Sequence, residues 1–347
     1  MERIENTTPE GELRNRAVEI HALNPTVDSH CDTPMLYEEG GFNFESDNNI
    51  AKVDLPKMTR GHLDTAIVVA YLPQFTPPDQ ATSKALEILR RFKTDIAKLN
   101  DKVVIAKGVG EIFAAKFTGL KSIMLGVENG LAIGSDISNI DLFKKEGAIY
   151  ITLCHNGSNN ICDSAVGSQP HNGVSSFGRQ VIERMNNLGI TVDISHSAES
   201  STWDALRLSR QPIIASHSSC KAICDHPRNL SDETIKAIAS QGGVVQICAY
   251  SAFLNPDENK ASIHDIVAHI EHVITLTKSY NFVGIGSDFD GGGGVNGFED
   301  AGDFINLTTE LLRRGHTAEN IAKIMGGNIL RVIASNQAGN KIEPFKA

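Results

Sequence analysis

The sequence has no long apolar segment, no strongly basic stretch and no paired-cysteine motif. Its longest apolar run, Ala66 to Leu72, is far shorter than the roughly 18 residues needed to cross a bilayer. The N-terminus, MERIENTTPEGELRNR, is charged where a signal peptide would be apolar, so we expect no membrane partner and a cytoplasmic location. Acidic and basic residues are interspersed at a net charge of -10, which argues against a nucleic-acid partner.

The cysteines do not form a framework either. Six cysteines in 347 residues show no CxxC spacing, and reduced thiols are the simplest interpretation. Hydrophobic residues make up 41% of the chain and charged residues 21%, so there is ample surface to bury and no signature of disorder. Because no linker, repeat or low-complexity tract divides the chain, we expect one domain over residues 1–347.

Apolar runs bounded by turn residues alternate with amphipathic segments along most of the chain. Strands of this kind indicate a parallel sheet covered by helices, and eight such units predict an α/β fold, a (β/α)8 TIM barrel with its core at about residues 26–315. The predicted strands are residues 26–32, 65–72, 122–128, 148–155, 190–196, 212–217, 243–250 and 282–289. The predicted helices are residues 83–99, 137–146, 177–188, 198–209, 232–240, 263–279 and 301–313, with only a turn or two at 54–61. Segments 10–23 and 318–335 are predicted to be helical additions packed outside the barrel.

Polar side chains are concentrated at the C-terminal ends of these strands. A lone histidine at a strand end is more often a solvated or capped residue than a ligand. In a barrel, however, all these ends converge on one mouth, the face at which barrel enzymes carry their chemistry. Seven of the eight predicted strands end in such groups, namely His30 and Asp32, Glu128, His155, His196, His217, Tyr250 and Asp288.

Five of these side chains predict a site for two cations. His30 and Asp32 are two apart on one strand, so both can enter the barrel. Three imidazoles and two carboxylates exceed the needs of one tetrahedral zinc but suit two ions that share a carboxylate. Glu128 is the expected bridge, because its strand lies between that pair and the strands of His196 and His217. A water or hydroxide between the ions would be the nucleophile, and the ligands favour zinc without excluding manganese, cobalt or nickel.

Two further residues are candidates for chemistry at this mouth. Asp288, in GIGSDFDG, would be ionised beside the cations and could carry a proton from the water to a leaving amine. The alternative, a turn aspartate that caps a glycine-rich loop, also describes Asp290. His155 could polarise a carbonyl or stabilise an oxyanion, or it could support a ligand from behind.

Several stretches of the chain resemble the membrane (renal-type) dipeptidases of the amidohydrolase superfamily. They span about residues 26 to 300 in the same order, and the SHS…HPRNLSD block is highly specific. The matching stretches are VDSHCDTP (27–34), GVENG (126–130), YITLCHNGSNN (150–160), DISHSAES (193–200), PIIASHSSCKAICDHPRNLSD (212–232), GGVVQICAY (242–250) and GIGSDFDG (284–291).

The resemblance implies a barrel of the metal-dependent hydrolase type that holds two zinc ions per chain. It places His30, Asp32 and Glu128 on one zinc and Glu128, His196 and His217 on the other. It also implies His155 at the transition-state oxygen, Arg228 on the substrate's C-terminal carboxylate, Tyr250 beside it, and Asp288 in proton transfer. Without the resemblance, Arg228 would be interpreted as a surface charge in a loop.

Four residues depart from the family pattern without removing a ligand. They bear on the shape of the substrate pocket, and hence on side-chain preference. These residues are Ser29, Cys31, Asn129 and Ile161. The anchor and secretion signals of animal members are also missing, so the chain resembles the bacterial type.

The sequence therefore predicts a zinc-dependent metallo-dipeptidase. It would hydrolyse dipeptides with a free C-terminal carboxylate by attack of a hydroxide that bridges two zinc ions. The alternative enzyme is another amidohydrolase that cleaves N-acyl amino acids, lactams or lactones. An inactive barrel that only binds peptide or metal is the alternative from another class, but it would not need both a bridging carboxylate and Asp288. The expected partner is a dipeptide or similar small molecule, and a homodimer is left open.

Overall fold

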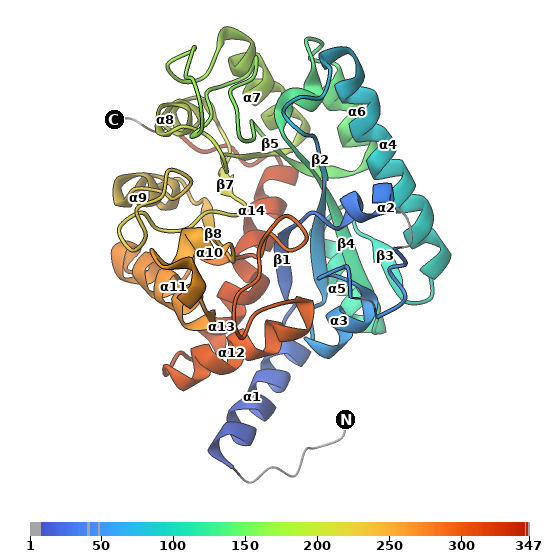
Figure 1. The fold of residues 1–347 in the computed structure, drawn as a ribbon, viewed down its shortest axis with the longest axis vertical. Coiled ribbons are helices and arrows are strands. Elements are labelled where there is room, and N and C mark those ends of the chain that lie inside the picture. The colour runs from blue at the N-terminus through green and yellow to red at the C-terminus, as the bar shows by residue number, and fades with distance from the viewer. Residues whose placement is uncertain (1–7, 40–41, 48, 344, 346–347) are drawn as a thin grey trace.

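Eight parallel strands form a nearly closed barrel that helices surround (Figure 1). The computed structural model describes residues 8–39, 42–47, 49–343 and 345, and the barrel strands follow the order of the chain. They are β1 (Val27–Cys31), β2 (Thr65–Tyr71), β4 (Lys121–Glu128), β5 (Ala148–Thr152), β6 (Thr191–Asp193), β7 (Ile214–Ala215), β8 (Val244–Cys248) and β9 (Val283–Gly286). The predicted (β/α)8 barrel is confirmed, although most strands are shorter than predicted.

Helices follow the strands where amphipathic periodicity predicts them. Helix α7 shows how local sequence sets the boundaries, because the Ser175 side chain accepts a hydrogen bond from the Gly178 amide at its start and Gly189 takes φ 64° at its end. The helices are α1 (Pro9–Leu23), α2 (Leu36–Glu39), α3 (Leu55–Arg60), α4 (Pro78–Ile96), α5 (Val109–Thr118), α6 (Asn139–Glu146), α7 (Ser176–Leu188), α8 (Glu199–Leu208), α9 (Asp232–Ser240), α10 (Ser251–Leu254), α11 (Ile263–Thr277), α12 (Phe304–Arg313), α13 (Ala318–Ala322) and α14 (Asn328–Gln337).

Two elements between α4 and β4 are missing from the prediction. Strand β3 (Val103–Ile105) pairs with the first residues of β4, before the point at which β5 begins to pair with it. Three residues are too few to show a strand period. Helix α5 follows, and its Phe113 and Phe117 are 53% and 92% exposed, so the apolar residues do not mark a single buried face.

The C-terminal segment 318–335, predicted as one helix outside the barrel, is broken and lies across the barrel. A π-helical turn (Lys323–Gly327) separates α13 from α14. A Cβ on Gly326 would lie 2.4 Å from the Pro25 carbonyl oxygen, so the close approach of this turn to the start of β1 requires glycine. Helix α14 packs its apolar face on the interior side chains of the strands and closes the end opposite the mouth. That face is Ile329, Leu330, Val332 and Ile333, and the interior residues include Val27, Ile67, Met124, Ile214 and Val244.

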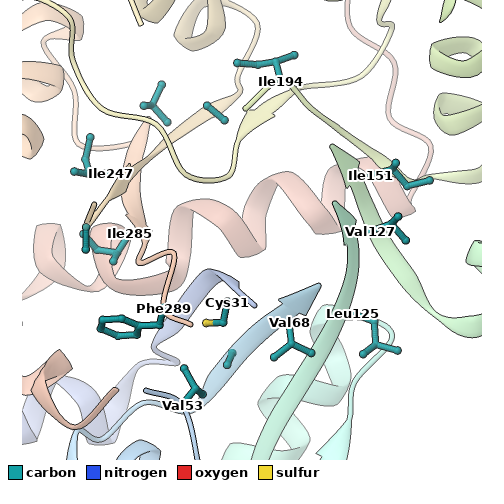
Figure 2. Packing of buried hydrophobic residues seen from close by; sticks show 14 of the residues in the cluster. Cys31, Val53, Val68, Leu125, Val127, Ile151, Ile194, Ile247, Ile285 and Phe289 are labelled. Carbon is teal, nitrogen blue, oxygen red and sulfur yellow. The ribbon is translucent and has the colours of Figure 1, made fainter. Parts of the chain in front are cut away.

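The outward side chains of the strands form a second apolar layer beneath the helices (Figure 2). Those labelled around the barrel include Cys31, Val68, Leu125, Val127, Ile151, Ile194, Ile247 and Ile285. Between β1 and β9 the barrel is joined by backbone hydrogen bonds from the Asp288 amide to the His30 carbonyl oxygen (3.1 Å) and from the Asp32 amide to the Phe289 carbonyl oxygen (2.8 Å). The Asp28 carboxylate adds to this seam, because it accepts hydrogen bonds from the Ser287 amide (2.9 Å) and hydroxyl (2.5 Å). Among the described residues, none of the helices combines the length and the apolar composition needed to cross a membrane.

Candidate metal centre

The structure gathers the polar residues that follow the barrel strands at one mouth. Glu128 is the last residue of β4 and His30 lies within β1, whereas His155, His196 and His217 follow shortened strands, since β5 ends at Thr152, β6 at Asp193 and β7 at Ala215. A cavity of about 500 Å³ opens over them. Its walls include Asp32, Glu128, His155, His196, Arg228, Tyr250 and Asp288, while His30 and His217 are buried beneath.

His30 enters the barrel because β1 contains an irregularity. The pairing of β1 with β2 shifts register between Asp28 and Cys31, so Val27 and His30 both face inward although they are three residues apart. The His30 Nε2 atom then lies 3.6 Å from the Asp32 Oδ2 atom and 3.6 Å from the Glu128 Oε1 atom. His30, Asp32 and Glu128 form one group whose ligand atoms lie within 4.8 Å of one another.

A second group shares the same glutamate. The Glu128 Oε1 atom lies 3.1 Å from the His196 Nε2 atom and 3.5 Å from the His217 Nε2 atom. His196 takes a positive φ of 68°, which is uncommon outside glycine and turns the ring toward its neighbour. The two groups therefore meet at Glu128, in the arrangement that the sequence predicts for a bridging carboxylate.

The Nδ1 atom of each of these three histidines faces an oxygen that can accept a hydrogen bond. The Nδ1 atom of His30 is 2.8 Å from the Tyr150 hydroxyl, that of His196 is 2.9 Å from the Asn156 Oδ1 atom, and that of His217 is 2.8 Å from the Ser216 hydroxyl. A proton on each Nδ1 leaves a lone pair on each Nε2. All three lone pairs then point toward Glu128.

This concentration of acceptors fits a divalent cation. Within the described ranges, the buried His30 Nε2 and Asp32 Oδ1 atoms have no hydrogen-bond partner. Burial lowers the pKa of His30, but the carboxylates of Glu128 and Asp32 raise it well above its ordinary value. Burial likewise raises the pKa of Glu128, but His30 and the hydrogen bond from His196 hold it well below its usual range. The His30 ring thus lies where positive charge is favoured. Cations bound here would meet three imidazoles and two carboxylates.

Asp288 lies against this group on the loop that follows β9. It has a positive φ of 60° and forms a further group of possible ligands with His30 and His217. Burial raises the pKa of the Asp288 carboxyl to about 6. A Cβ on Gly291 would lie 2.2 Å from the Asp32 Oδ2 atom and 2.5 Å from the Asp288 Oδ1 atom, so only glycine lets the loop pack here.

Asp290, two residues further on, has a different task. Its carboxylate accepts hydrogen bonds from the Thr33 hydroxyl (2.7 Å) and the Lys52 amide (2.6 Å). The turn interpretation predicts that Asp290 caps the glycines that follow it. Its carboxylate instead ties the loop to the segments of Thr33 and Lys52.

His155 stands beside the second group at the edge of the cavity. Its ring lies between Tyr71 and His196, at centroid distances of 4.7 and 4.1 Å, and its Nε2 atom is 4.0 Å from the Glu128 Oε1 atom. Burial lowers the pKa of His155. The neutral ring can donate one hydrogen bond into the cavity.

Arg228 supplies positive charge to the cavity wall. Its guanidinium is buried over the Phe253 ring, donates to the His217 carbonyl oxygen (3.1 Å) and the Ser218 hydroxyl (3.4 Å), and leaves its Nε atom without a partner. It forms no ion pair with any carboxylate of the described residues. Tyr250 lines the same wall, so the structure brings the two residues together as the resemblance implies.

Several residues that support the site escaped the sequence analysis. Tyr150, Asn156, Asp193 and Ser216 all contact the ligand histidines directly or through one another. The sequence does single out Asp193, because a carboxylate inside the apolar strand ITVDISH (190–196) needs a buried hydrogen-bond partner. The four departures from the family pattern do not line the cavity, since Ser29, Cys31, Asn129 and Ile161 are buried behind its wall.

The chain is similar over most of its length to known dipeptidases. A sequence model of the membrane dipeptidase family (peptidase family M19) matches residues 14–344. Dipeptidase aclJ of Aspergillus oryzae (strain ATCC 42149 / RIB 40) is 30% identical over 330 residues, which cover 89% of this chain and 77% of the relative.

Two solved structures are also similar. The probable dipeptidase PvdM from Pseudomonas aeruginosa has a TM-score of 0.90 at 26% identity and covers 96% of this chain and 100% of its own. A metallopeptidase from Rhodobacter sphaeroides, liganded with a phosphinate mimic of the dipeptide L-Ala-D-Ala, has a TM-score of 0.82 at 22% identity. It covers 89% of this chain and 98% of its own, and this likeness concerns the fold alone.

Proposed function

Because the chain belongs to the membrane dipeptidase family and is a metallopeptidase of that family, we propose that it hydrolyses dipeptides with a free C-terminal carboxylate, using two zinc ions. The observation that carries the proposal is the layout of one cavity. The ligand group lies on its floor, and Arg228, a buried cation with no carboxylate partner among the described residues, lies in its wall. A small anionic substrate can therefore be held with one of its bonds over the floor.

The two ligand groups would hold one ion each and share Glu128. Divalent ions at these positions supply an activated water and polarise the scissile carbonyl. Nitrogen and oxygen ligands in these proportions favour zinc.

The other residues would bind the substrate and move protons. Arg228 would pair with the terminal carboxylate through two parallel hydrogen bonds, with Tyr250 beside it. Asp288 would accept a proton from the attacking water and pass it to the leaving amine. His155 would donate a hydrogen bond to the oxygen that gains negative charge.

A dipeptide panel with controlled metal content tests this function. The protein is stripped with a chelator, and release of free amino acid is followed with and without added zinc, using substrates that include L-Ala-L-Ala and L-Ala-D-Ala. We expect cleavage only when metal is returned. The phosphinate mimic bound by the Rhodobacter sphaeroides relative makes a D-residue on the C-terminal side worth testing. Cleavage confined to N-acyl amino acids, lactams or lactones would contradict the proposal.

A further inference from the structure

Ser216 lies between ligands of the two proposed metal sites. Its hydroxyl oxygen is 2.8 Å from the Nδ1 atom of His217 and 3.3 Å from the Nδ1 atom of His30. Of the two ligand groups that meet at Glu128, one contains His30 and the other contains His217, and the centroids of these rings are only 3.8 Å apart. Ser216 is fully buried beneath the cavity floor, so its hydroxyl contacts the ligands from behind.

Below Ser216 lies the fully buried carboxylate of Asp193. Its Oδ1 atom accepts hydrogen bonds from the backbone amides of Ser195 (3.1 Å) and Ser216 (2.8 Å). Its Oδ2 atom accepts from the hydroxyls of Thr152 (2.5 Å) and Ser216 (2.7 Å). Four donors thus satisfy this carboxylate, which forms no ion pair with any described residue. Its negative charge lies one hydroxyl away from the ligand rings.

A count of protons fixes the direction of each hydrogen bond. A serine hydroxyl has one proton, and Ser216 uses it to donate a hydrogen bond to the Asp193 carboxylate. The Ser216 oxygen can then only accept hydrogen bonds, from the two imidazole rings and from the Ser195 hydroxyl, which is 3.3 Å away. The Nδ1 atom of His217 has no other partner among the described residues, so its proton must reside there and its Nε2 atom keeps a lone pair.

His30 has a second acceptor, which makes it less dependent on Ser216. The Tyr150 hydroxyl is 2.8 Å from the His30 Nδ1 atom and donates its own proton to the Ser29 carbonyl oxygen (3.0 Å). The Tyr150 oxygen therefore also accepts from His30. His196 is oriented separately by Asn156.

We propose that Asp193 is a positioning residue that, through Ser216, holds His217 and in part His30 in the one tautomer that can bind metal. The inference rests on the proposed two-ion centre. One buried carboxylate thereby supports ligands of both sites, more strongly at the site of His196 and His217 than at the site of His30 and Asp32. Partners of this kind behind a ligand typically change metal affinity by roughly 10- to 100-fold.

The substitution Asp193→Asn reverses the hydrogen bonds without changing the shape. The amide oxygen would remain on the backbone amides, so the NH2 group would face Ser216 and donate to its oxygen. The Ser216 proton would then turn toward His217 Nδ1, and the His217 proton would move to Nε2, where it blocks the metal. Ser216→Ala removes the connecting hydroxyl altogether and leaves the buried His217 Nδ1 proton without an acceptor.

Thr152→Val is the matched control. It deletes the other hydroxyl on the same Asp193 oxygen but touches neither histidine, so it reports the cost of losing a hydrogen bond in this network. Tyr150→Phe removes the main hydrogen-bond acceptor of His30 and leaves His217 untouched. It should lower the metal affinity of the site of His30 and Asp32.

Zinc affinity is measured by competition with a chelator, and the absorption spectrum of cobalt-loaded protein shows whether the ligand set has changed. Urea unfolding of the metal-free variants separates lost binding from lost folding. We expect Asp193→Asn and Ser216→Ala each to lower the zinc affinity of the site of His196 and His217 by roughly 10- to 100-fold. The affinity of the site of His30 and Asp32 should fall by less. Thr152→Val should lose stability while its zinc affinities stay near those of wild type.

Wild-type zinc affinity in both Asp193→Asn and Ser216→Ala would overturn the inference, as would an equal loss in Thr152→Val. If Asp193→Asn does not fold, Ser216→Ala decides the question against the same control. A wild-type protein that binds no divalent ion would overturn the proposed function and this inference together. Normal binding by the variants would overturn the inference alone, so the two failures can be told apart.

Discussion

The Nε2 atoms of His196 and His217 lie 2.8 Å apart, and the opposite nitrogen of each ring faces a hydrogen-bond acceptor. When both protons reside on Nδ1, two lone pairs face each other across this short gap, beside the Glu128 carboxylate. Such a contact is unfavourable without a positive charge between the atoms. This arrangement supports the proposal that a cation binds beside these two rings.

Glu128→Gln should deplete both metal sites together. The Glu128 Oε1 atom lies within 3.6 Å of the Nε2 atoms of His30, His196 and His217, and an amide lacks the charge and the second anionic oxygen of a bridge. Elemental analysis of purified wild-type protein should approach two divalent ions per chain, and the variant should hold close to none.

Glu319→Gln, at an exposed carboxylate that pairs with Lys323, is the control and should keep its full metal content. Loss of a single ion from the Glu128 variant would show that the carboxylate serves one site only. Fully active wild-type protein with one ion per chain would contradict the two-ion centre.

The sequence could predict the barrel and the residues that follow its strands because both depend on local patterns. Apolar strands alternate with amphipathic helices, and the two-residue spacing of His30 and Asp32 predicts that their side chains point the same way. The supporting contacts could not be predicted this way. Ser216 meets His30 across 186 residues of sequence, and the closing position of α14 depends on the break at Gly326. Such contacts are properties of the packed barrel.

Asp288→Asn should separate chemistry from metal binding. The variant keeps its shape but cannot accept a proton, so kcat should fall by roughly 100-fold or more. Metal content should stay near wild type, because the two ligand groups that meet at Glu128 do not include Asp288. Steady-state kinetics and elemental analysis on the same preparation check both parts. Near-normal turnover would assign Asp288 a structural role.

His21 should make the fold less stable in acid. Its ring is buried between the His62 carbonyl oxygen (3.1 Å) and the Thr308 hydroxyl (2.6 Å), and burial lowers its pKa from 6.5 to about 3. Between these values the unfolded chain binds a proton that the folded chain does not. The stabilisation is complete above pH 6.5 and is lost as the pH falls toward 3. His21 alone should remove about 2 kcal/mol of unfolding free energy between pH 7 and pH 5.

Urea unfolding of metal-free protein at the two pH values measures this effect. His21→Gln can still donate a hydrogen bond but does not titrate, so its stability should change by about 2 kcal/mol less than that of wild type. His171→Gln, at an exposed histidine, is the matched control and should keep the wild-type dependence. An identical pH dependence in wild type and His21→Gln would show that the buried ring is not the source.

Arg228 should make the enzyme select free over amidated dipeptides. Its guanidinium is buried in the cavity wall, and no carboxylate in the described part of the chain pairs with it, so a substrate carboxylate would complete a two-pronged, charge-assisted pair. Amidation of the C-terminus removes that charge and should lower kcat/KM by about 30- to 1000-fold. This corresponds to a loss of roughly 2 to 4 kcal/mol of transition-state stabilisation.

Substitution of the arginine tests whether this residue carries the preference. Arg228→Met should bring the two substrates close to equal rates, and Arg228→Lys should restore only part of the preference, because a point charge lacks the paired geometry. Arg207→Met, at an arginine outside the cavity wall, should leave the preference unchanged. Since a general amidase or lactonase has no reason to discriminate in this way, equal rates of wild-type protein on free and amidated dipeptides would assign the cavity to another amide or ester substrate.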